Sequence, residues 1–240
     1  MTNDLGEMFW KSHYTEEDMK KYIVWNAIKD EDFNKNTAKE CERIIQSLGF
    51  YNTEDKLVVD FGCGIGRLTR FLGANTNNML LGIDVDSIRV NKAKEYITQP
   101  FDIKTGINNK GNKVEYKWIP QFAAMQNGYT LPVADEQVDF VFSHIVLQHI
   151  HKYKVYFILK EFFRMLKKGG KGFIQLPNFE KCMKQYDMYA TDFIKLESSP
   201  WSAMNFWFKE EAKIILEKVG FEIDAVAEEG TDLYITFKKP

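Results

Sequence analysis

The sequence predicts an α/β protein in which a mainly parallel sheet carries helices on both faces. Between residues 56 and 177, short apolar runs rich in β-branched residues alternate with amphipathic helical patterns. A glycine-rich turn joins the first of these runs to the helix that follows it. The chain has 240 residues, of which 45% are hydrophobic and 15% aromatic, so one domain can bury a sizeable core.

The first 55 residues read as a helical cap that precedes the sheet. The stretch "TEEDMKKYIVWNAI" begins with Thr15 as an N-cap and carries acidic residues in its first turn. A second helix, "TAKECERIIQSLGF", is expected to start near Thr37 and to stop at Gly49.

The alternating region, residues 56–178, is predicted to supply five strands and three helices in chain order. The expected strands are "KLVVDF", "MLLGIDV", "VEYKWI", "VDFVFS" and "KGFIQLP". The expected helices are "GRLTRFLG", "SIRVNKAKEYI" and "KVYFILKEFFRMLKKGG", the last stopped by its basic residues and glycines.

The alternation lapses after Asn178. Residues 179–207 form an aromatic-rich insertion, and residues 208–240 are predicted to close the fold with a helix that ends at Gly220 and two strands. A turn around Gly230 joins these strands, so we expect them to pair antiparallel.

Composition limits the class of partner. Lys plus Arg number 32 and Asp plus Glu number 34, so the net charge of −2 indicates neither a nucleic-acid partner nor a membrane surface, and a small substrate is expected. The three cysteines, Cys41, Cys63 and Cys182, form no pair motif and fit a reducing compartment. With no signal peptide at the N-terminus and no long apolar run, we expect a cytoplasmic protein.

The turn "DFGCGIG" follows a strand and opens a helix, which is the setting of a nucleotide site. It does not end in Gly-Lys-Ser/Thr, as a phosphate-binding P-loop does, and its G-x-G-x-G spacing differs from the G-x-G-x-x-G of hydride cofactors. Asp60, two residues before the first glycine, suits a ligand that bears an ammonium group better than a pyrophosphate. A purely structural turn is the alternative.

A second acidic residue follows the next predicted strand. Asp84 lies 22 positions after Gly62, at the carboxyl end of "GID". An acid at this place can accept both hydroxyls of a ribose. Its alternative role is to cap the following helix, although Asp86 or Ser87 can also do that.

Together these segments resemble the class I S-adenosylmethionine-dependent methyltransferases. The resemblance rests on "VVDFGCGIGR", "LGIDVD", "NGYTLPVADEQVDFVFSHIVLQHI" and "EFFRMLKKGGKGFIQLP", which follow one another at suitable intervals from about Lys56 to Pro177. It implies a Rossmann-like, doubly wound sheet of seven strands whose last strand is antiparallel. It also implies S-adenosylmethionine as the cofactor and S-adenosylhomocysteine as its product.

The resemblance also implies where the cofactor binds. Asp60 and the turn would hold the methionine part, Asp84 the ribose, Val85 the adenine ring, and Asn127 with Gly128 the adenine amino group, where the family more often has Asp. Ser143 would face the sulfonium. The full set of expected cofactor contacts is Asp60, Gly62, Cys63, Gly64, Gly66, Arg67, Asp84, Val85, Asn127, Gly128, Ser143, Trp10 and Tyr14.

His144 ends the fourth predicted strand and is the candidate general base or acceptor contact. Packing against the cofactor is its alternative role. His149, Gln175 and Asn178 are the candidate acceptor contacts, although an orienting or structural role is favoured for His149. No motif indicates a metal ion. The N-terminal helices and the insertion 179–207 are expected to act as lids, with Trp10 and Tyr14 over the cofactor.

The function expected from this pattern is methyl transfer to oxygen or nitrogen of a small polar acceptor, for instance a sugar or glycan precursor. That acceptor rests on resemblance alone, because a fold and a cofactor do not fix the second substrate. An RNA or protein methyltransferase and a non-catalytic cofactor-binding module are the alternatives. The oligomeric state is left open.

Overall fold

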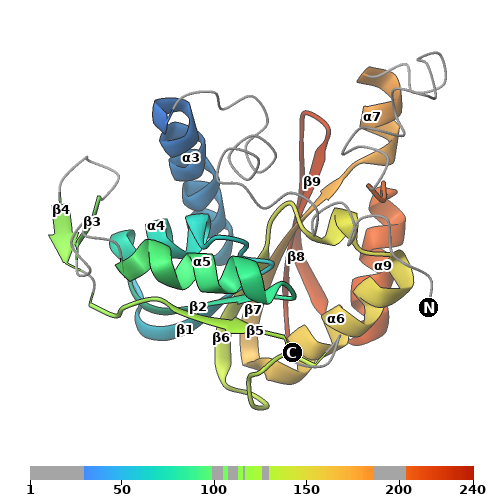
Figure 1. Cartoon of the computed structure of the whole chain (residues 1–240). Helices are drawn as coiled ribbons and strands as arrows, with labels where there is room; N and C mark the ends of the chain where they lie inside the picture. The colour runs from blue at the N-terminus through green and yellow to red at the C-terminus, as the bar shows by residue number, and fades with distance from the viewer. Residues whose placement is uncertain (1–29, 99–104, 108–112, 116, 126–129, 186–203) are drawn as a thin grey trace.

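The computed structural model describes residues 30–98, 105–107, 113–115, 117–125, 130–185 and 204–240 (Figure 1). A central sheet carries helices on both of its faces. The helices are α3 (Asp30–Leu48), α4 (Arg67–Asn75), α5 (Ser87–Thr98), the short 3₁₀ turn η1 (Leu147–His149), α6 (Lys152–Met165), α7 (Phe179–Gln185) and α9 (Lys209–Val219). The strands are β1 (Glu54–Phe61), β2 (Asn77–Asp84), β3 (Thr105–Ile107), β4 (Lys113–Glu115), β5 (Gln121–Ala124), β6 (Val138–Ser143), β7 (Leu166–Pro177), β8 (Glu222–Glu229) and β9 (Asp232–Lys238).

Seven of the strands form one sheet in the order β5-β2-β1-β6-β7-β9-β8. The first five pair in parallel, whereas β9 runs antiparallel to both β7 and β8. This confirms the predicted seven-stranded sheet and its antiparallel last strand. The strand order reverses beside β1, and ligands of such sheets bind at the carboxyl ends of the strands at this switch point.

Alternating residues of each strand divide the core into two layers. Val58, Phe142 and Phe173 pack against α3 and α4, in a cluster that includes residues of both helices. Their neighbours along the strands, Val59, Val141 and Ile174, pack with residues of α6 and α9 on the other face. In Figure 1, α3 at the upper left and α7 at the upper right both extend above the sheet.

The prediction for the third strand was wrong. Lys113–Glu115 pairs antiparallel with β3 in a separate two-stranded hairpin, and the strand beside β2 is β5, a few residues further along. Phe122 of β5 lies opposite Gly82. A Cβ on that glycine would come within 2.6 Å of the Phe122 ring, so the missing side chain is what makes room for this strand.

Two boundaries also differ from those expected. Helix α3 begins at Asp30 rather than near Thr37. Helix α6 ends at Met165, and Gly169 and Gly170 belong to β7 instead of stopping the helix. Backbone hydrogen bonds from Gly169 to Lys239 and from Lys239 to Gly170, at 2.8 and 2.9 Å, extend the β7–β9 pairing through these glycines.

The closing elements follow the prediction. Helix α9 ends at Gly220, and β8 and β9 form an antiparallel pair joined at Gly230. Within the described ranges, no helix has both the length and the apolar character that crossing a bilayer requires.

Candidate functional site

The glycine-rich turn between β1 and α4 has the backbone geometry that its glycines predict. Gly62, Gly64 and Gly66 have φ values of 80°, 55° and 78°. The N–H groups of Gly62 and Cys63 both donate to the carbonyl of Ile83, at 2.7 and 3.1 Å, which ties the turn to the end of β2. At Gly62 a Cβ would lie 2.3 Å from the side chain of Val146, so only glycine fits there.

Asp60 lies just before this turn and is buried, with 2% of its surface exposed. The hydroxyl of Thr69, on α4, donates to its Oδ2 at 2.6 Å. Burial raises the pKa of Asp60 to about 7, although the hydrogen bond from Thr69 and the nearby charge of Arg67 oppose the rise. A buried carboxyl group in this state favours a cationic partner, because a positive charge would stabilise its ionised form.

Asp84, at the carboxyl end of β2, holds two backbone segments together. Its Oδ2 accepts the N–H of Gly64 at 2.8 Å, and its Oδ1 accepts the N–H of Asp86 at 2.9 Å. Burial raises the pKa of this carboxyl group too. Each oxygen has a second lone pair, so both can still accept a ligand hydroxyl. The next side chain, Val85, is 53% exposed and available as an apolar contact.

Open space lies beside Gly64. A Cβ built on Gly64 meets no described atom within 4 Å, so the turn borders open space next to Asp84 and Val85. Arg67, in contrast, reaches back to α3, where it donates to Thr37 Oγ1 at 3.0 Å and pairs with Glu40 at 2.6 Å. Its expected contact with the cofactor thus competes with these two partners. The buried thiol of Cys63 has a pKa raised by burial and lies within the turn.

His144 directly follows β6 on the face that packs against α3. Only 4% of its side chain is exposed, and neither ring nitrogen has a hydrogen-bond partner within the part of the chain that the structure describes. Its Nδ1 lies 4.0 Å from Oε2 of Glu40. Burial lowers the pKa of His144 to about 4, with Glu40 acting in the opposite direction. The imidazole is therefore neutral at physiological pH and can accept a proton or a hydrogen bond.

Ser143, the last residue of β6, adds a second unbonded polar group at the same edge. Its side chain is fully buried, and its hydroxyl oxygen has no hydrogen-bond partner among the described residues. Buried polar groups are usually paired, so these two adjacent groups at the carboxyl end of β6 are candidates for contact with a ligand.

Gln175, near the end of β7, does not present a free amide. Its Oε1 accepts the N–H of Ile145 at 2.9 Å, and its Nε2 donates to Oδ1 of Asp232 at 2.6 Å. The hydroxyl of Tyr234 donates to the other oxygen of Asp232 at 3.3 Å. The ring of Tyr234 in turn stacks over His144, with 6.5 Å between ring centroids and 20° between planes.

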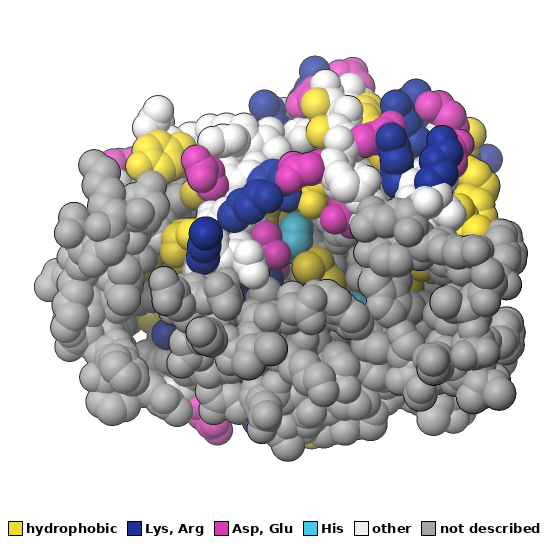
Figure 2. All heavy atoms as spheres, turned by 90° about the horizontal axis from the view of Figure 1, so that it is seen from above, with side chains coloured by type: hydrophobic (Ala, Val, Ile, Leu, Met, Phe, Trp, Pro, Cys, Tyr) yellow, Lys and Arg dark blue, Asp and Glu magenta, His cyan; other side chains and the backbone are white. Residues whose placement is uncertain are grey.

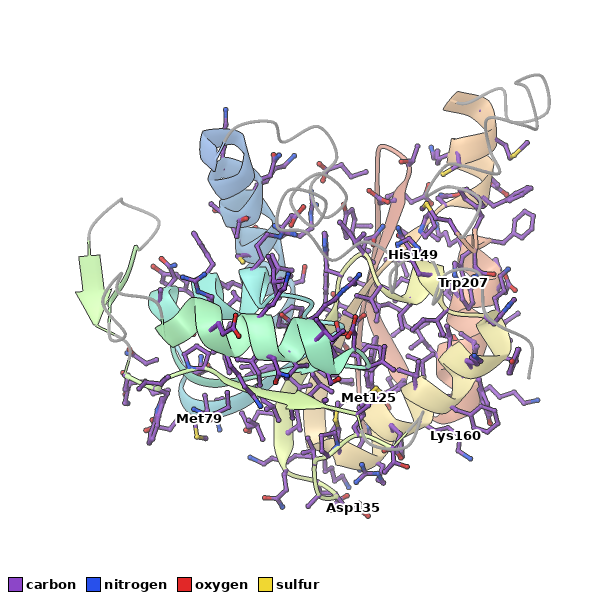
Figure 3. The ribbon with its side chains drawn as sticks, viewed as in Figure 1. Met79, Met125, Asp135, His149, Lys160 and Trp207 are labelled. Atoms are coloured by element: carbon purple, nitrogen blue, oxygen red, sulfur yellow. The ribbon has the colours of Figure 1, made fainter. Side chains whose placement is uncertain are left out.

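Asn178 and His149 lie farther along the same edge. The Asn178 side chain begins α7, where its Oδ1 accepts the N–H of Glu180 at 3.0 Å. His149 belongs to η1, and its Nε2 lies 3.3 Å from the amide nitrogen of Gln148. Asn205 binds the Gln148 carbonyl through its own N–H at 2.6 Å, so the segment leading to Trp207 lies against the turn that carries His149 (Figure 3).

The surface above this edge is hollowed. Figure 2 shows a histidine on the floor of the hollow, acidic side chains beside it and basic ones along one side. Two basic residues of α3, Lys39 and Arg43, pair with Glu229 of β8. The guanidinium group of Arg43 also lies 4.1 Å from the centre of the Tyr234 ring. Charges of both signs therefore surround the buried imidazole.

Several residues of this edge escaped the sequence analysis. Glu40, Arg43, Asp232 and Tyr234 belong to no motif, and only the alternation along β9 places Asp232 and Tyr234 on the same face as Gln175. Four predicted cofactor contacts, Trp10, Tyr14, Asn127 and Gly128, lie outside the described residues.

Comparison with known proteins agrees with this geometry. Residues 59–174 match the family described as "Methyltransferase domain". This segment contains the glycine-rich turn, Asp84 and His144. Residues 59–174 of the chain form a methyltransferase domain, and S-adenosylmethionine is the cofactor that goes with it.

The relatives act on different acceptors, according to their names. Phosphoethanolamine N-methyltransferase 1 of Triticum aestivum is 25% identical over 234 residues, which are 96% of this chain, and the chain spans 41% of that protein's length. Phosphoethanolamine N-methyltransferase 2 of Haemonchus contortus, solved with S-adenosyl-L-methionine, has a TM-score of 0.68 at 16% identity, covering 98% of this chain and 59% of its own. Magnesium protoporphyrin IX methyltransferase of Synechocystis PCC 6803, solved with S-adenosylhomocysteine, has a TM-score of 0.64 at 15% identity over 99% and 96% of the two chains. The two structures share the fold.

Proposed function

We propose that the chain transfers the methyl group of S-adenosylmethionine to a small polar acceptor that binds beside His144. The observation that carries this proposal is the buried, neutral His144, whose ring nitrogens have no hydrogen-bond partner among the described residues. It follows β6, which pairs with β1, the strand that leads into the glycine-rich turn; Asp84 ends β2 on the other side of β1. Ligands of such sheets bind at this edge, so a basic group here is placed to act on an acceptor beside the cofactor.

The proposed cofactor contacts follow from the geometry of β1 and β2. Asp60 holds the ammonium group directly or through water, Asp84 accepts the ribose hydroxyls, and Val85 packs against the adenine ring. Cys63 and Ser143 stay cofactor contacts predicted from the sequence. The assignments of Asn127, Gly128, Trp10 and Tyr14 stay predictions from the sequence.

The bound cofactor supplies an electrophilic methyl group on a positively charged sulfur. The protein's own task is to orient the acceptor and to take the proton that the acceptor loses. His144 is placed to take this proton: its imidazole is neutral, although burial lowers its pKa to about 4 and so makes it a weaker base than a free histidine. The carboxylate of Glu40, 4.0 Å from Nδ1, then faces the imidazolium with a negative charge.

For the acceptor, we propose a small phosphorylated amine of the phosphoethanolamine type. The wheat relative aligns with 96% of this chain, which includes α3 and the closing strands as well as the cofactor-binding segment. Lys39 and Arg43 of α3, which both pair with Glu229, are the basic side chains that we propose exchange this partner for the phosphate. An alkyl ammonium has no lone pair until it loses a proton, so the neutral amine is the form that accepts the methyl group. A sugar or glycan precursor is the second acceptor class, from the sequence resemblance.

The test combines calorimetry with transfer of an isotopically labelled methyl group. We expect S-adenosylhomocysteine to bind, and phosphoethanolamine to accept the label while ethanolamine, which lacks the phosphate, accepts it poorly. Transfer to a nucleotide sugar, to RNA or to a protein in place of phosphoethanolamine would replace the acceptor assignment. Binding without transfer to any of them would support a non-catalytic module, and absence of binding would refute the proposal as a whole.

Two histidine variants separate the base from its surroundings. His144→Ala should retain binding of S-adenosylhomocysteine but lose turnover by a factor of about 10² to 10⁴, the usual contribution of a positioned base. His151→Ala, at an exposed histidine that precedes α6, is the matched control and should retain both. Normal turnover of His144→Ala would exclude the base role, and the same measurement on His149→Ala would show whether the neighbouring histidine carries it.

A further inference from the structure

The backbone immediately after His144 is strained. Ile145 has a φ of 59°, in the left-handed region that β-branched residues rarely adopt. Such a conformation persists only where the surrounding structure enforces it. Ile145 belongs to the bend that begins at His144, directly after β6.

A chain of hydrogen bonds across three strands enforces this conformation. The Ile145 N–H donates to Oε1 of Gln175 on β7 at 2.9 Å, and Nε2 of Gln175 donates to Oδ1 of Asp232 on β9 at 2.6 Å. The partners also fix the orientation of the amide. An N–H on one side requires the amide oxygen, and a carboxylate on the other requires the amide nitrogen.

The same carboxylate supports the ring of His144 from the other side. Oδ2 of Asp232 accepts the Tyr234 hydroxyl at 3.3 Å, and the Tyr234 ring stacks over His144. Gln175 is 3% exposed, so these bonds are largely shielded from water. Asp232 is thus connected to His144 by two routes, through the backbone of Ile145 and through the ring of Tyr234.

We propose that Gln175 and Asp232 are positioning residues, which hold the strained turn at Ile145 and thereby fix the imidazole of His144 toward the acceptor. This replaces the direct acceptor contact that the sequence suggested for Gln175, because both ends of its amide are engaged within the protein. The proposal rests on the proposed function only in the role that it gives to His144.

An exchange of donor and acceptor across the pair tests this proposal. Gln175→Glu has nearly the same shape and keeps an oxygen for Ile145, but it sets a second carboxylate against Asp232. Gln175→Glu combined with Asp232→Asn restores one donor and one acceptor with reversed direction. If the pair acts by hydrogen bonding, we expect the single variant to lose kcat about tenfold or more and the double variant to recover most of it.

Two readouts keep the proposal separate from the identity of the acceptor. NMR of protein with isotope-labelled histidine, assigned through His144→Ala, reports the ring environment and titration of His144 without any acceptor. We expect Gln175→Glu to shift these signals and the double variant to return them toward their original positions. The Kd of S-adenosylhomocysteine should change less than twofold to threefold throughout, since the glycine-rich turn and Asp84 lie on β1 and β2.

Unchanged His144 signals and kcat in Gln175→Glu would overturn the proposal, and so would a double variant that is no better than the single one. If phosphoethanolamine is not methylated by the wild type, the acceptor assignment fails while the NMR result still decides the role of Gln175 and Asp232. Gln175→Met removes both hydrogen bonds at similar volume. It should reproduce the NMR shifts of Gln175→Glu, and a wild-type spectrum for Gln175→Met would also contradict the proposal.

Discussion

Asp84 accepts the N–H of Gly64 at 2.8 Å, so the acidic end of β2 and the glycine-rich turn after β1 form one hydrogen-bonded unit. The two strongest sequence signals for the cofactor therefore act on each other as well as on a ligand. A change at Asp84 is expected to disturb the turn, and its effects on folding and on binding have to be measured separately.

Asp84→Ala should destabilise the protein and weaken cofactor binding. The variant leaves the N–H groups of Gly64 and Asp86 without their partner, which should lower the unfolding free energy by about 1–3 kcal/mol. It also removes the proposed acceptor for the ribose hydroxyls, with a similar expected loss of binding free energy. Denaturant unfolding and calorimetry with S-adenosylhomocysteine measure the two effects. Unchanged affinity in a folded variant would mean that Asp84 serves the backbone alone.

Binding of the cofactor product should release a proton from Asp60. With a pKa of about 7 in the free protein, Asp60 is mostly protonated at pH 6, whereas the ligand's ammonium group favours its ionised form. Calorimetry at pH 6 in buffers of different ionisation enthalpy should detect this release, and the affinity should rise with pH toward 7. Asp60→Asn should abolish the release, while Asp135→Asn, at an exposed carboxylate, should retain it.

His144 should make the folded protein less stable in mild acid. Its pKa is about 4 in the folded chain and near 6.5 when unfolded, so the unfolded state binds more protons between these values. Stability from this group is complete above pH 6.5 and is lost as the pH falls toward 4, by on the order of 3 kcal/mol. Denaturant unfolding at several pH values checks this. The unfolding free energy of the wild type should fall relative to that of His144→Phe as the pH falls. A pH-independent difference would contradict the buried, neutral imidazole.

Two alanine variants in the glycine-rich turn should behave differently. In Gly62→Ala the new Cβ would lie 2.3 Å from Val146, and the residue has a φ of 80°, so we expect a loss of unfolding free energy of about 3 kcal/mol or more. In Gly64→Ala the Cβ meets no described atom within 4 Å, which leaves a backbone cost of about 1 kcal/mol. Gly64→Ala should therefore fold but bind S-adenosylhomocysteine weakly, because the methyl group enters the cofactor's space. Equal stability of the two variants would exclude this account.

The fold was predictable where local pattern and tertiary role coincide. The runs "VVDF" and "VDFVFS" are buried strands in the structure because β-branched and aromatic residues suit a strand that is covered on both faces. The run "VEYKWI" has the same composition, yet only Lys113–Glu115 is a strand, in the separate hairpin. Strand β5, with the sequence "QFAA", has little β-propensity and is placed by the fit of Phe122 against Gly82.

Within the candidate site, sequence spacing singles out only the residues around the glycine-rich turn. Asp60, the glycines and Asp84 lie close together in a motif, so their spacing carries information about the ligand. The rest of the site depends on pairing between strands that are far apart in sequence: Gln175 and Asp232 are 57 positions apart, and Glu40 reaches His144 from α3. No spacing rule links such residues, because the sheet register brings them together only when the fold is complete.

The position of β9 between β7 and β8 imposes an order on folding. Strand β8 has no hydrogen-bonded contact with β7 and joins the sheet only through β9, which comes later in the chain. On the ribosome, β8 must therefore wait until residues 232–238 have emerged. Because Asp232 and Tyr234 arrive with the same segment, the support of His144 is completed in the same step that closes the sheet, and a partly synthesised chain lacks it.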